Sequence, residues 1–290
     1  MEQVLLLKLA SEIHLKSDFV RKEFEEALQQ NMRNALKNNK IEIKQFVKKR
    51  GKIILNTNNN KKAIMILKKV FGIHSIAETN YVKAKEISDV QQNVLKYVKP
   101  ILKKKDSFAL RVNRIGSQKF SSTDIAIQCG KAIQQSIDVS VNLDNPKKEI
   151  FIELDEDDLF LFSKIEECAR GIPVGVEGKI GLLMEGNASE FLAGKLMLKR
   201  GCEIIPLVQK NKAKCVEILK KLKEYNAYVE FKPLFISLDK LRFNFDALIV
   251  SYDKTTKQNL DSLIELQKKY NIAVFAPLLG LSKELLKELK

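Results

Sequence analysis

The sequence has few of the residues that build metal or disulfide sites. It contains four cysteines (Cys129, Cys168, Cys202 and Cys215) with no Cys-x-x-Cys pair, and only two histidines. These spacings argue against a structural zinc site and against a disulfide framework. We therefore expect no metal site and interpret the thiols as buried or incidental side chains.

Long apolar runs are also missing. The longest, over residues 180–184 and 272–281, are too short to cross a bilayer. An apolar run near the N-terminus follows Glu2, is interrupted by Lys8, and lacks a basic leader or a cleavage pattern. The composition, 45% apolar and 30% charged, fits a globular protein. We predict a cytoplasmic protein with no membrane partner.

Positive charge is what the chain has in excess. Its 51 Lys and Arg residues outnumber 36 Asp and Glu residues, which gives a formal net charge of +15. Residues 1–79 carry 16 basic and 8 acidic side chains, residues 80–163 carry 13 and 12, and residues 164–290 carry 22 and 16. The middle balance is small because acids cluster at Glu153 and over 155–158. Such a field favours a polyanion such as nucleic acid; a lysine-rich solubilising surface is the alternative.

Apolar periodicity divides the chain into three predicted domains: 1–79, 80–163 and 164–290. The first two read as α+β domains. Residues 1–79 contain strands at 4–9, 41–44 and 52–55 and helices after Ser17 or Asp18 and at 61–70, in the order of a ferredoxin-like fold. Residues 80–163 contain helices at 90–101 and 125–137 and strands at 108–114, 139–143 and 149–153.

The third domain alternates strands with helices. Its strands are expected at 180–184, 203–208, 228–231, 247–250 and 273–276, and its helices at 190–200, 213–226 and 260–270. This alternation predicts a doubly wound parallel sheet, whose ligand site lies at the carboxyl ends of the strands. The loop after the first of these strands is therefore the expected ligand position.

That loop consists of Glu185, Gly186, Asn187, Ala188, Ser189 and Glu190. A strand followed by a glycine-bearing loop and a helix N-terminus is the usual way to build an anion site, because free backbone N–H groups and the helix dipole point at the loop. Here only Gly186 is a glycine, and Glu185 and Glu190 flank it. Since both carboxylates would repel a phosphate, we interpret the segment as a degenerate nucleotide loop with no catalytic residue.

A second candidate site combines cations with hydroxyl groups, the side chains that position a nucleic-acid backbone. Its members in the second domain are Lys103, Lys104, Lys105, Arg111, Arg114, Lys119, Ser121 and Ser122, and those in the first domain are Lys16, Arg21 and Arg50. This set suits RNA recognition by shape and backbone rather than by sequence. Phe120 lies among them, but we interpret it as a core anchor in preference to a base-stacking residue.

Several segments resemble the tRNA 4-thiouridine synthetase family, also known as tRNA sulfurtransferase or by a thiamine biosynthesis name. The segments 108–114, 119–122, 130–132 and 141–153 are similar to a THUMP domain, and 12–17, 24–25 and 71–73 to the ferredoxin-like domain that precedes it. Residues 171–179 and 196–201 match the flanks of the family's PP-loop. The resemblance implies that the first two domains bind the tRNA acceptor region, that the third adenylates a uridine, and that a persulfide cysteine delivers sulfur.

The chain departs from that family at the expected reaction site. Glu185–Glu190 stand where the family has Ser-Gly-Gly-x-Asp-Ser, Ser251-Tyr252-Asp253 does not preserve a second loop, and Ser282 stands where an aspartate is expected. The region between Phe231 and Ala247 is too short for the family's active cysteine, and we expect no rhodanese domain. We therefore predict a tRNA-binding protein without adenylation chemistry and without a cofactor.

Two alternatives remain open. In the first alternative, the chain is an active tRNA sulfurtransferase that uses ATP and Mg²⁺. It would carry sulfur on Cys202 or Cys215, and Lys199 and Arg200 would lower the pKa of Cys202. In the second alternative, the chain is a scaffold that recruits a separate catalytic subunit through its third domain. A homodimer is a further possible assembly. A buried thiol is the interpretation that we prefer for Cys202.

Overall fold

The computed structural model describes residues 1–49, 51–235, 237–240 and 244–288. Contacts divide the chain into two compact units. The first contains Met1–Leu7, Ile43–Asn60 and Ile76–Glu166, and the second contains Lys8–Glu42, Lys61–Ser75 and Glu167–Lys290. The predicted three-domain ranges stay a prediction. Among the described residues, no helix combines the length and apolar character that crossing a membrane requires.

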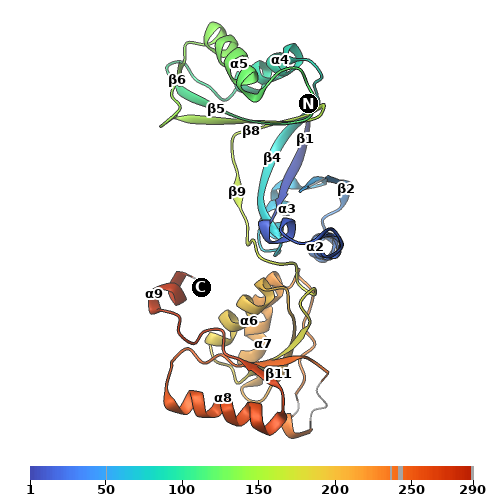
Figure 1. Ribbon diagram of the computed structural model, residues 1–290, viewed down its shortest axis with the longest axis vertical. Coiled ribbons are helices and arrows are strands. Elements are labelled where there is room, and N and C mark those ends of the chain that lie inside the picture. Colours follow the sequence, from blue (N-terminus) through green and yellow to red (C-terminus); the bar gives the residue numbers. More distant parts are fainter. Residues whose placement is uncertain (50, 236, 241–243, 289–290) are drawn as a thin grey trace. The chain divides into compact units, whose positions relative to one another are not determined.

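The first unit is built on a mixed sheet with the order β2-β3-β1-β4-β8-β7-β5-β6, and β9 also pairs with β4. Helices α4 (Ile87–Val98) and α5 (Ser122–Ser136) lie together on one face of its β5–β8 part (Figure 1). Its strands are β1 (Glu2–Leu9), β2 (Ile43–Lys49), β3 (Lys52–Thr57), β4 (Ile73–Lys83), β5 (Ser107–Ile115), β6 (Ser140–Val141), β7 (Lys148–Asp155), β8 (Asp158–Phe162) and β9 (Glu166–Glu167).

Helical spacing builds the core beneath α4 and α5. Val90, Val94 and Val98 recur every four residues along α4, so one buried stripe faces the sheet. Phe108 of β5 is fully buried against this stripe. Burial of each such side chain stabilises the fold by about 1.5–3 kcal/mol. The predicted helices and β5 are confirmed, whereas the strand expected at 139–143 is confined to Ser140–Val141.

Three strands of this sheet were not predicted from the sequence: the two-residue β9 and the longer β4 and β8. β4 and β8 pair antiparallel, and β4 crosses the predicted boundary at residue 79. β4 has no clear apolar alternation, because the polar residues Ser75 and Thr79 take buried positions. The Thr79 hydroxyl donates a hydrogen bond to the Val4 carbonyl at 3.2 Å. β8 is short and buried throughout, so it offers no alternation.

The acidic run near the end of β7 belongs to an ion network with lysines of the neighbouring strands. Its members are Lys49, Lys52, Tyr81, Lys83, Glu153, Asp155 and Asp158. Lys52 Nζ lies 2.9 Å from Glu153 and 3.2 Å from Asp155, and Lys52 and Glu153 are both buried. Three acids of the cluster, Glu153, Asp155 and Asp158, are therefore partners of lysines within the sheet.

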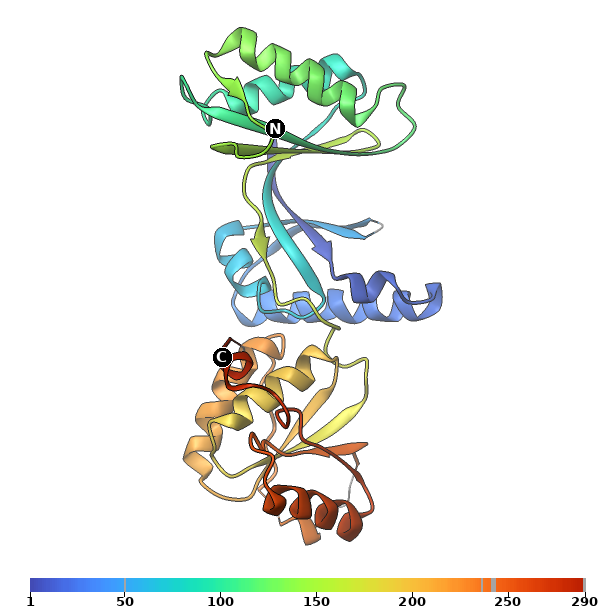
Figure 2. The same ribbon diagram turned by 60° about the vertical axis from the view of Figure 1, so that its left-hand side comes forward.

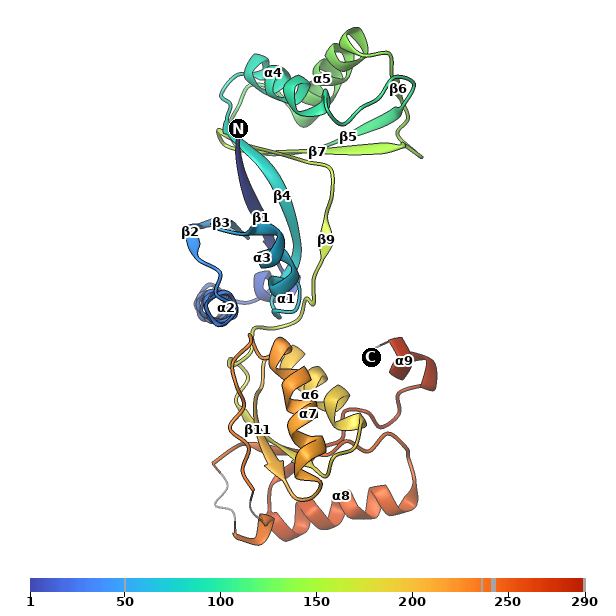
Figure 3. The ribbon, with the colours of Figure 1, turned by 180° about the vertical axis from the view of Figure 1, so that it is seen from behind.

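The second unit contains a four-stranded parallel sheet with the order β11-β10-β12-β13. Helices α6 and α7 cover one face and α8 covers the other (Figure 3), as predicted for a doubly wound sheet. The strands are β10 (Lys179–Met184), β11 (Glu203–Val208), β12 (Ala247–Ile249) and β13 (Ala273–Phe275), and these helices are α6 (Ser189–Lys199), α7 (Lys212–Leu222) and α8 (Lys257–Tyr270). The strand expected at 228–231 is wrong; Leu234 instead bridges Leu207 of β11.

The unit also includes helices from the N-terminal part of the chain. They are α1 (Ser11–His14), the long α2 (Asp18–Asn38), seen side-on in Figure 2, and α3 (Asn60–Leu67). Two 3₁₀ turns, η1 (Lys223–Tyr225) and η2 (Leu238–Lys240), and the C-terminal α9 (Lys283–Glu288) complete it. The predicted combination of α+β and α/β architecture is confirmed.

Candidate functional site

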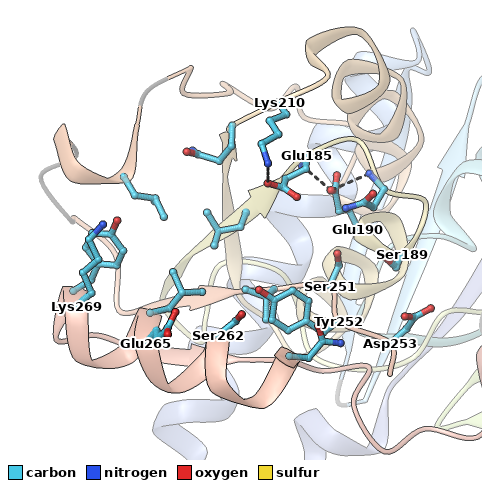
Figure 4. Close-up of a pocket in the computed structure, with 18 residues that line it drawn as sticks. Glu185, Ser189, Glu190, Lys210, Ser251, Tyr252, Asp253, Ser262, Glu265 and Lys269 are labelled. Atoms are coloured by element: carbon cyan, nitrogen blue, oxygen red, sulfur yellow. Dashed lines mark hydrogen bonds and ion pairs between the residues drawn. The ribbon is translucent and has the colours of Figure 1, made fainter. Parts of the chain in front are cut away.

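A cleft opens where the strand order of the parallel sheet reverses, between β10 and its neighbour β12. The chain leaves both strands at their carboxyl ends there, which is where doubly wound folds bind ligands. The cleft has a volume of about 810 Å³. Glu185 and Ser189 line it from the loop after β10, Ser251 and Tyr252 from the loop after β12, and Glu265 from α8 (Figure 4).

Glu190 fills the anion-binding position of its own loop. Its Oε1 accepts hydrogen bonds from the Glu185 N–H at 2.7 Å and the Asn187 N–H at 3.0 Å, and its Oε2 accepts one from the Gly186 N–H at 3.2 Å. The side chain is only 1% exposed. Burial raises the pKa of Glu190, and the hydrogen bonds from the three N–H groups lower it by less than burial raises it. The position that a bound anion would take in this loop is therefore filled by a side chain of the same chain.

Gly186 lets this loop close. Its φ of +90° lies in the left-handed region, and a Cβ atom there would come within 2.7 Å of the Asn211 Cβ. Two neighbours after β11 fix the loop from outside: Asn211 Nδ2 donates to the Glu185 carbonyl at 3.0 Å, and Lys210 Nζ lies 2.9 Å from the Glu185 carboxylate. A glycine and two polar side chains thus hold the loop in a closed form.

The residues of the cleft do not fit a triphosphate. Three N–H groups that could cradle a phosphate already bind Glu190, and each further carboxylate 4 Å from a phosphate charge costs about 1–4 kcal/mol, depending on the dielectric. Lys210 pairs with Glu185 and Lys269 pairs with Asp239 at 2.8 Å, so both lysines have carboxylate partners. Within the described ranges no three His, Cys, Asp or Glu side chains gather as metal ligands.

The cysteines considered as sulfur carriers are buried. Cys202 is 7% exposed, as the preferred interpretation of a buried thiol predicts, and burial, followed by the nearby Glu177, raises its pKa despite Arg200. The lowered pKa that the sulfurtransferase alternative included is therefore wrong. Cys215 is fully buried, and its thiol donates a hydrogen bond to the Lys210 carbonyl at 3.3 Å. Burial also raises the Cys215 pKa. Both environments oppose a reactive thiolate.

The predicted RNA-binding lysines of the first unit reach solvent. Lys103, Lys104 and Lys105 are exposed in the turn that leads into β5, and Lys119 is exposed in the loop before α5. Lys104 Nζ lies 3.8 Å from Asp138, a pair in which both side chains are largely exposed. Exposed pairs of this kind contribute little, so these lysines can still meet phosphates.

The two predicted arginines lie on opposite faces of β5, because side chains alternate along a strand. Arg111 donates to Glu149 at 2.8 Å and to the Leu143 carbonyl at 2.9 Å. Arg114 donates to the Gly116 carbonyl and to Gln118, both at 2.8 Å. Each arginine therefore has internal partners and organises the local structure as well as carrying charge.

The remaining predicted residues have mixed positions. Ser121 caps α5: its hydroxyl donates to Asp124 at 2.8 Å and accepts from the Asp124 N–H at 3.1 Å, while Ser122 begins the helix. Phe120 packs on the α4–α5 core, as expected of an anchor. In the second unit, Lys16 Nζ lies 5.2 Å from the centre of the Phe24 ring and Arg21 pairs with Asp18 at 2.6 Å. Arg50 lies outside the described residues.

The sequence patterns did not mark the residues that close the loop, and they marked Tyr252 of the cleft wall only as a departure from the family's second loop. Lys210 and Asn211 follow β11, and Tyr252 follows β12. The rule that ligands bind at the carboxyl ends of parallel strands could have identified all three, because it applies to each strand of the sheet. Tyr270 comes from the end of α8, and no local sequence pattern marked it.

Comparison with known proteins places these features in a family. The ThiI ferredoxin-like domain matches residues 4–77 and the THUMP domain matches residues 84–164. A probable tRNA sulfurtransferase of Sulfurisphaera tokodaii is 29% identical and covers 99% of this chain and 85% of its own length. Another from Saccharolobus islandicus is 35% identical over 71% of this chain; the chain spans 53% of that relative.

Two solved structures share the architecture. The PH1313 protein of Pyrococcus horikoshii aligns over 100% of this chain and 98% of its own, with a TM-score of 0.86 and 26% identity. A 4-thiouridine synthetase in complex with RNA and ATP aligns over 100% of this chain and 84% of its own, with a TM-score of 0.76 and 22% identity, and shows the shared fold. The two domain matches and the relatives together show that the chain belongs to the tRNA sulfurtransferase family.

Proposed function

We propose that this protein binds tRNA in the cytoplasm and does not adenylate it. The observation that carries the second half is the Glu190 carboxylate, which holds the three backbone N–H groups of the loop after β10. The first half is supported by the THUMP domain and by relatives named as probable tRNA sulfurtransferases. A structural neighbour was solved as a complex with RNA and ATP, so RNA binding fits this fold.

The RNA-binding surface under this proposal includes the exposed lysines of the first unit. Lys103–Lys105 and Lys119 flank β5 and α5, and their side chains are exposed to solvent. Such groups bind phosphates and fix the register of a nucleic acid, which suits recognition of folded RNA by its backbone. Sulfur transfer to the bound tRNA, where it occurs, then requires a separate catalytic subunit.

Binding of tRNA can be measured by filter retention between 50 and 200 mM salt. We expect affinity that falls steeply with salt and a double variant, Lys104→Glu with Lys119→Glu, that binds at least tenfold more weakly with a shallower slope. Lys96→Glu on the exposed side of α4 is the matched control. Absence of tRNA binding by the wild-type chain, or binding that ignores salt, would contradict the first half of the proposal.

The adenylation half is tested by ATP–pyrophosphate exchange in the presence of tRNA. We expect no exchange and no calorimetric signal for ATP, with or without tRNA, since Glu190 occupies the loop. Exchange by the wild-type chain would establish the alternative, an ATP- and Mg²⁺-dependent sulfurtransferase. The buried states of Cys202 and Cys215 already weigh against either thiol as its sulfur carrier.

A further inference from the structure

A second cavity of the second unit carries an unusual charge. It has a volume of about 750 Å³ and is lined by α6, by η1 and by the end of α3 with the turn after it. Its charged lining residues are five lysines and one glutamate: Lys62, Lys68, Lys69, Lys195, Lys199 and Glu224. Phe71, Tyr225 and Tyr228 form the aromatic part of the wall, and aliphatic side chains such as Leu192 and Leu196 complete its apolar part. A concave, cationic and aromatic surface of this kind is what single nucleotides bind.

We propose that this cavity binds one phosphate-bearing nucleotide unit of the tRNA, with the phosphate among the lysines and the base or ribose against the tyrosines. The inference rests on the proposed tRNA binding and adds a contact that neither THUMP-domain lysines nor the cleft at β10 supplies. A free nucleotide and a nucleotide within RNA both present a nucleoside monophosphate unit. We propose that the ligand is part of the RNA chain.

The lysines create a positive field inside the cavity. Lys195 is half-buried, and its pKa is lowered first by burial and then by Lys199 and Lys69. Its Nζ lies 4.8 Å from the centre of the Tyr225 ring, which fixes the ammonium over the aromatic wall. Lys199 and Lys69 thus act on Lys195 as like charges, and an entering phosphate would attract all three.

The aromatic wall is rigid, as a stacking platform should be. Tyr225 stacks on Phe71 with ring centres 5.9 Å apart and an interplanar angle of 29°, and it meets the edge of Phe191 at 6.1 Å. Tyr228 follows two residues after Asn226, and its carbonyl accepts a hydrogen bond from Asn38 Nδ2 at 3.0 Å. Because the Tyr225 ring is already held by Phe71 and Phe191, a base or ribose that packs at its edge costs little further ordering.

Glu224 is the one acid among the described residues of this lining, and it pairs with Lys69. This pair makes Glu224 a competitor of an entering phosphate: it both neutralises one lysine and repels the anion. Removal of the carboxylate therefore has an expected sign opposite to that of removing a lysine. A merely structural role of the cluster would not produce that opposition.

The test uses the full chain and tRNA binding across a salt series. Lys195→Gln with Lys199→Gln should weaken tRNA binding about tenfold near 150 mM salt and lower the salt slope by about 1–2. Glu224→Gln should strengthen binding about threefold or more. Lys268→Gln, exposed on α8, is the matched control, and thermal unfolding verifies that each variant is folded.

The outcomes separate this inference from the proposed function. If the wild-type chain fails to bind tRNA, both are wrong. If it binds tRNA and the lysine pair and Glu224→Gln leave affinity and slope unchanged, the inference alone is overturned. Titration with adenosine or uridine monophosphate distinguishes the source: saturation at micromolar nucleotide without any effect of the variants on tRNA binding would assign the cavity to a free nucleotide and overturn the RNA assignment.

Discussion

Replacing Glu190 with alanine should destabilise the second unit, because it removes the acceptor of three backbone N–H groups. A hydrogen bond to a charged acceptor contributes roughly 1.5–3 kcal/mol, but burial of the carboxylate offsets part of the sum. The raised pKa of Glu190 reports that offset. We therefore expect Glu190→Ala to lower the free energy of unfolding by about 2–4 kcal/mol, well below the sum of three bonds.

Glu190→Gln provides the graded comparison. Its carbonyl oxygen can still accept from the N–H groups of Glu185 and Asn187, which both bond to Oε1. Its amide nitrogen would face the Gly186 N–H, donor against donor. We expect a loss of about 1–2 kcal/mol, intermediate between the wild-type chain and Glu190→Ala.

The assay is urea unfolding of the full chain followed by circular dichroism and tyrosine fluorescence, since the sequence has no tryptophan. Two compact units are expected to give more than one transition, so the change is measured on the transition that the variant moves. Glu217→Ala, exposed on α7, is the control and should change stability by less than about 0.5 kcal/mol.

A second readout tests whether Glu190 really occupies an anion site. In Glu190→Ala the freed N–H groups should bind inorganic pyrophosphate, which would raise the melting temperature of the variant and leave that of the wild-type chain unchanged. At 100 times its dissociation constant a ligand restores about 2.7 kcal/mol. Equal stability of the wild-type chain and Glu190→Ala would refute the reasoning, as would equal responses of both to pyrophosphate.

The remaining predictions concern pH and thiols. Burial alone would raise the pKa of Asp158, but hydrogen bonds from Lys49, Lys83 and Tyr81 outweigh it and lower that pKa to about 2. The stabilisation by ionised Asp158 is therefore complete above about pH 4 and is lost as pH falls towards 2. It contributes about 2–3 kcal/mol to the free energy of unfolding, and unfolding measured across this pH range should show no such loss in Asp158→Asn. The pKa of Glu190 is shifted in the opposite direction, so folding favours its protonated form. As pH rises above the ordinary value of 4.5, the wild-type chain should therefore lose stability relative to Glu190→Gln. For the thiols, an aromatic disulfide reagent should modify partly exposed Cys168 first and reach the other three cysteines only on unfolding, with rates compared by absorbance; rapid modification of Cys202 or Cys215 in the folded chain would contradict their buried environments.

Periodic patterns in the sequence predicted the elements that depend on a single buried face. Val90, Val94 and Val98 define α4, and β10 and β11 each form a short apolar run in parallel register. β4 could not be found in this way, because Ser75 and Thr79 take buried positions that only tertiary hydrogen bonds make tolerable. The strand expected at 228–231 failed because its apolar residues do not join the sheet: Phe231 packs on the core of the second unit and Val229 is exposed.

At the candidate site, sequence reasoning identified the loop but not its internal bonding. Glu185 and Glu190 were both expected to repel a phosphate. The structure gives them different roles, since Glu185 pairs with Lys210 whereas Glu190 turns inward and bonds to the loop backbone. An acid in the first turn of α6 was a signal for such bonding, because a first-turn glutamate commonly reaches back to preceding N–H groups. The partner Lys210 lies on another segment, so only the fold could supply it.

The bonding of Glu190 also explains how a nucleotide-type domain can stay folded without a nucleotide. N–H groups that converge at a helix N-terminus need an acceptor, and a free phosphate supplies one only when it is present at sufficient concentration. A carboxylate four residues away is present at all times, with an effective concentration in the millimolar range or above. An incoming phosphate would have to displace the Glu190 carboxylate, and the displaced carboxylate would then repel the phosphate from nearby. A substitution elsewhere in the loop leaves that competitor in place, so under the proposed function we expect only removal of Glu190 itself to let these N–H groups bind a phosphate.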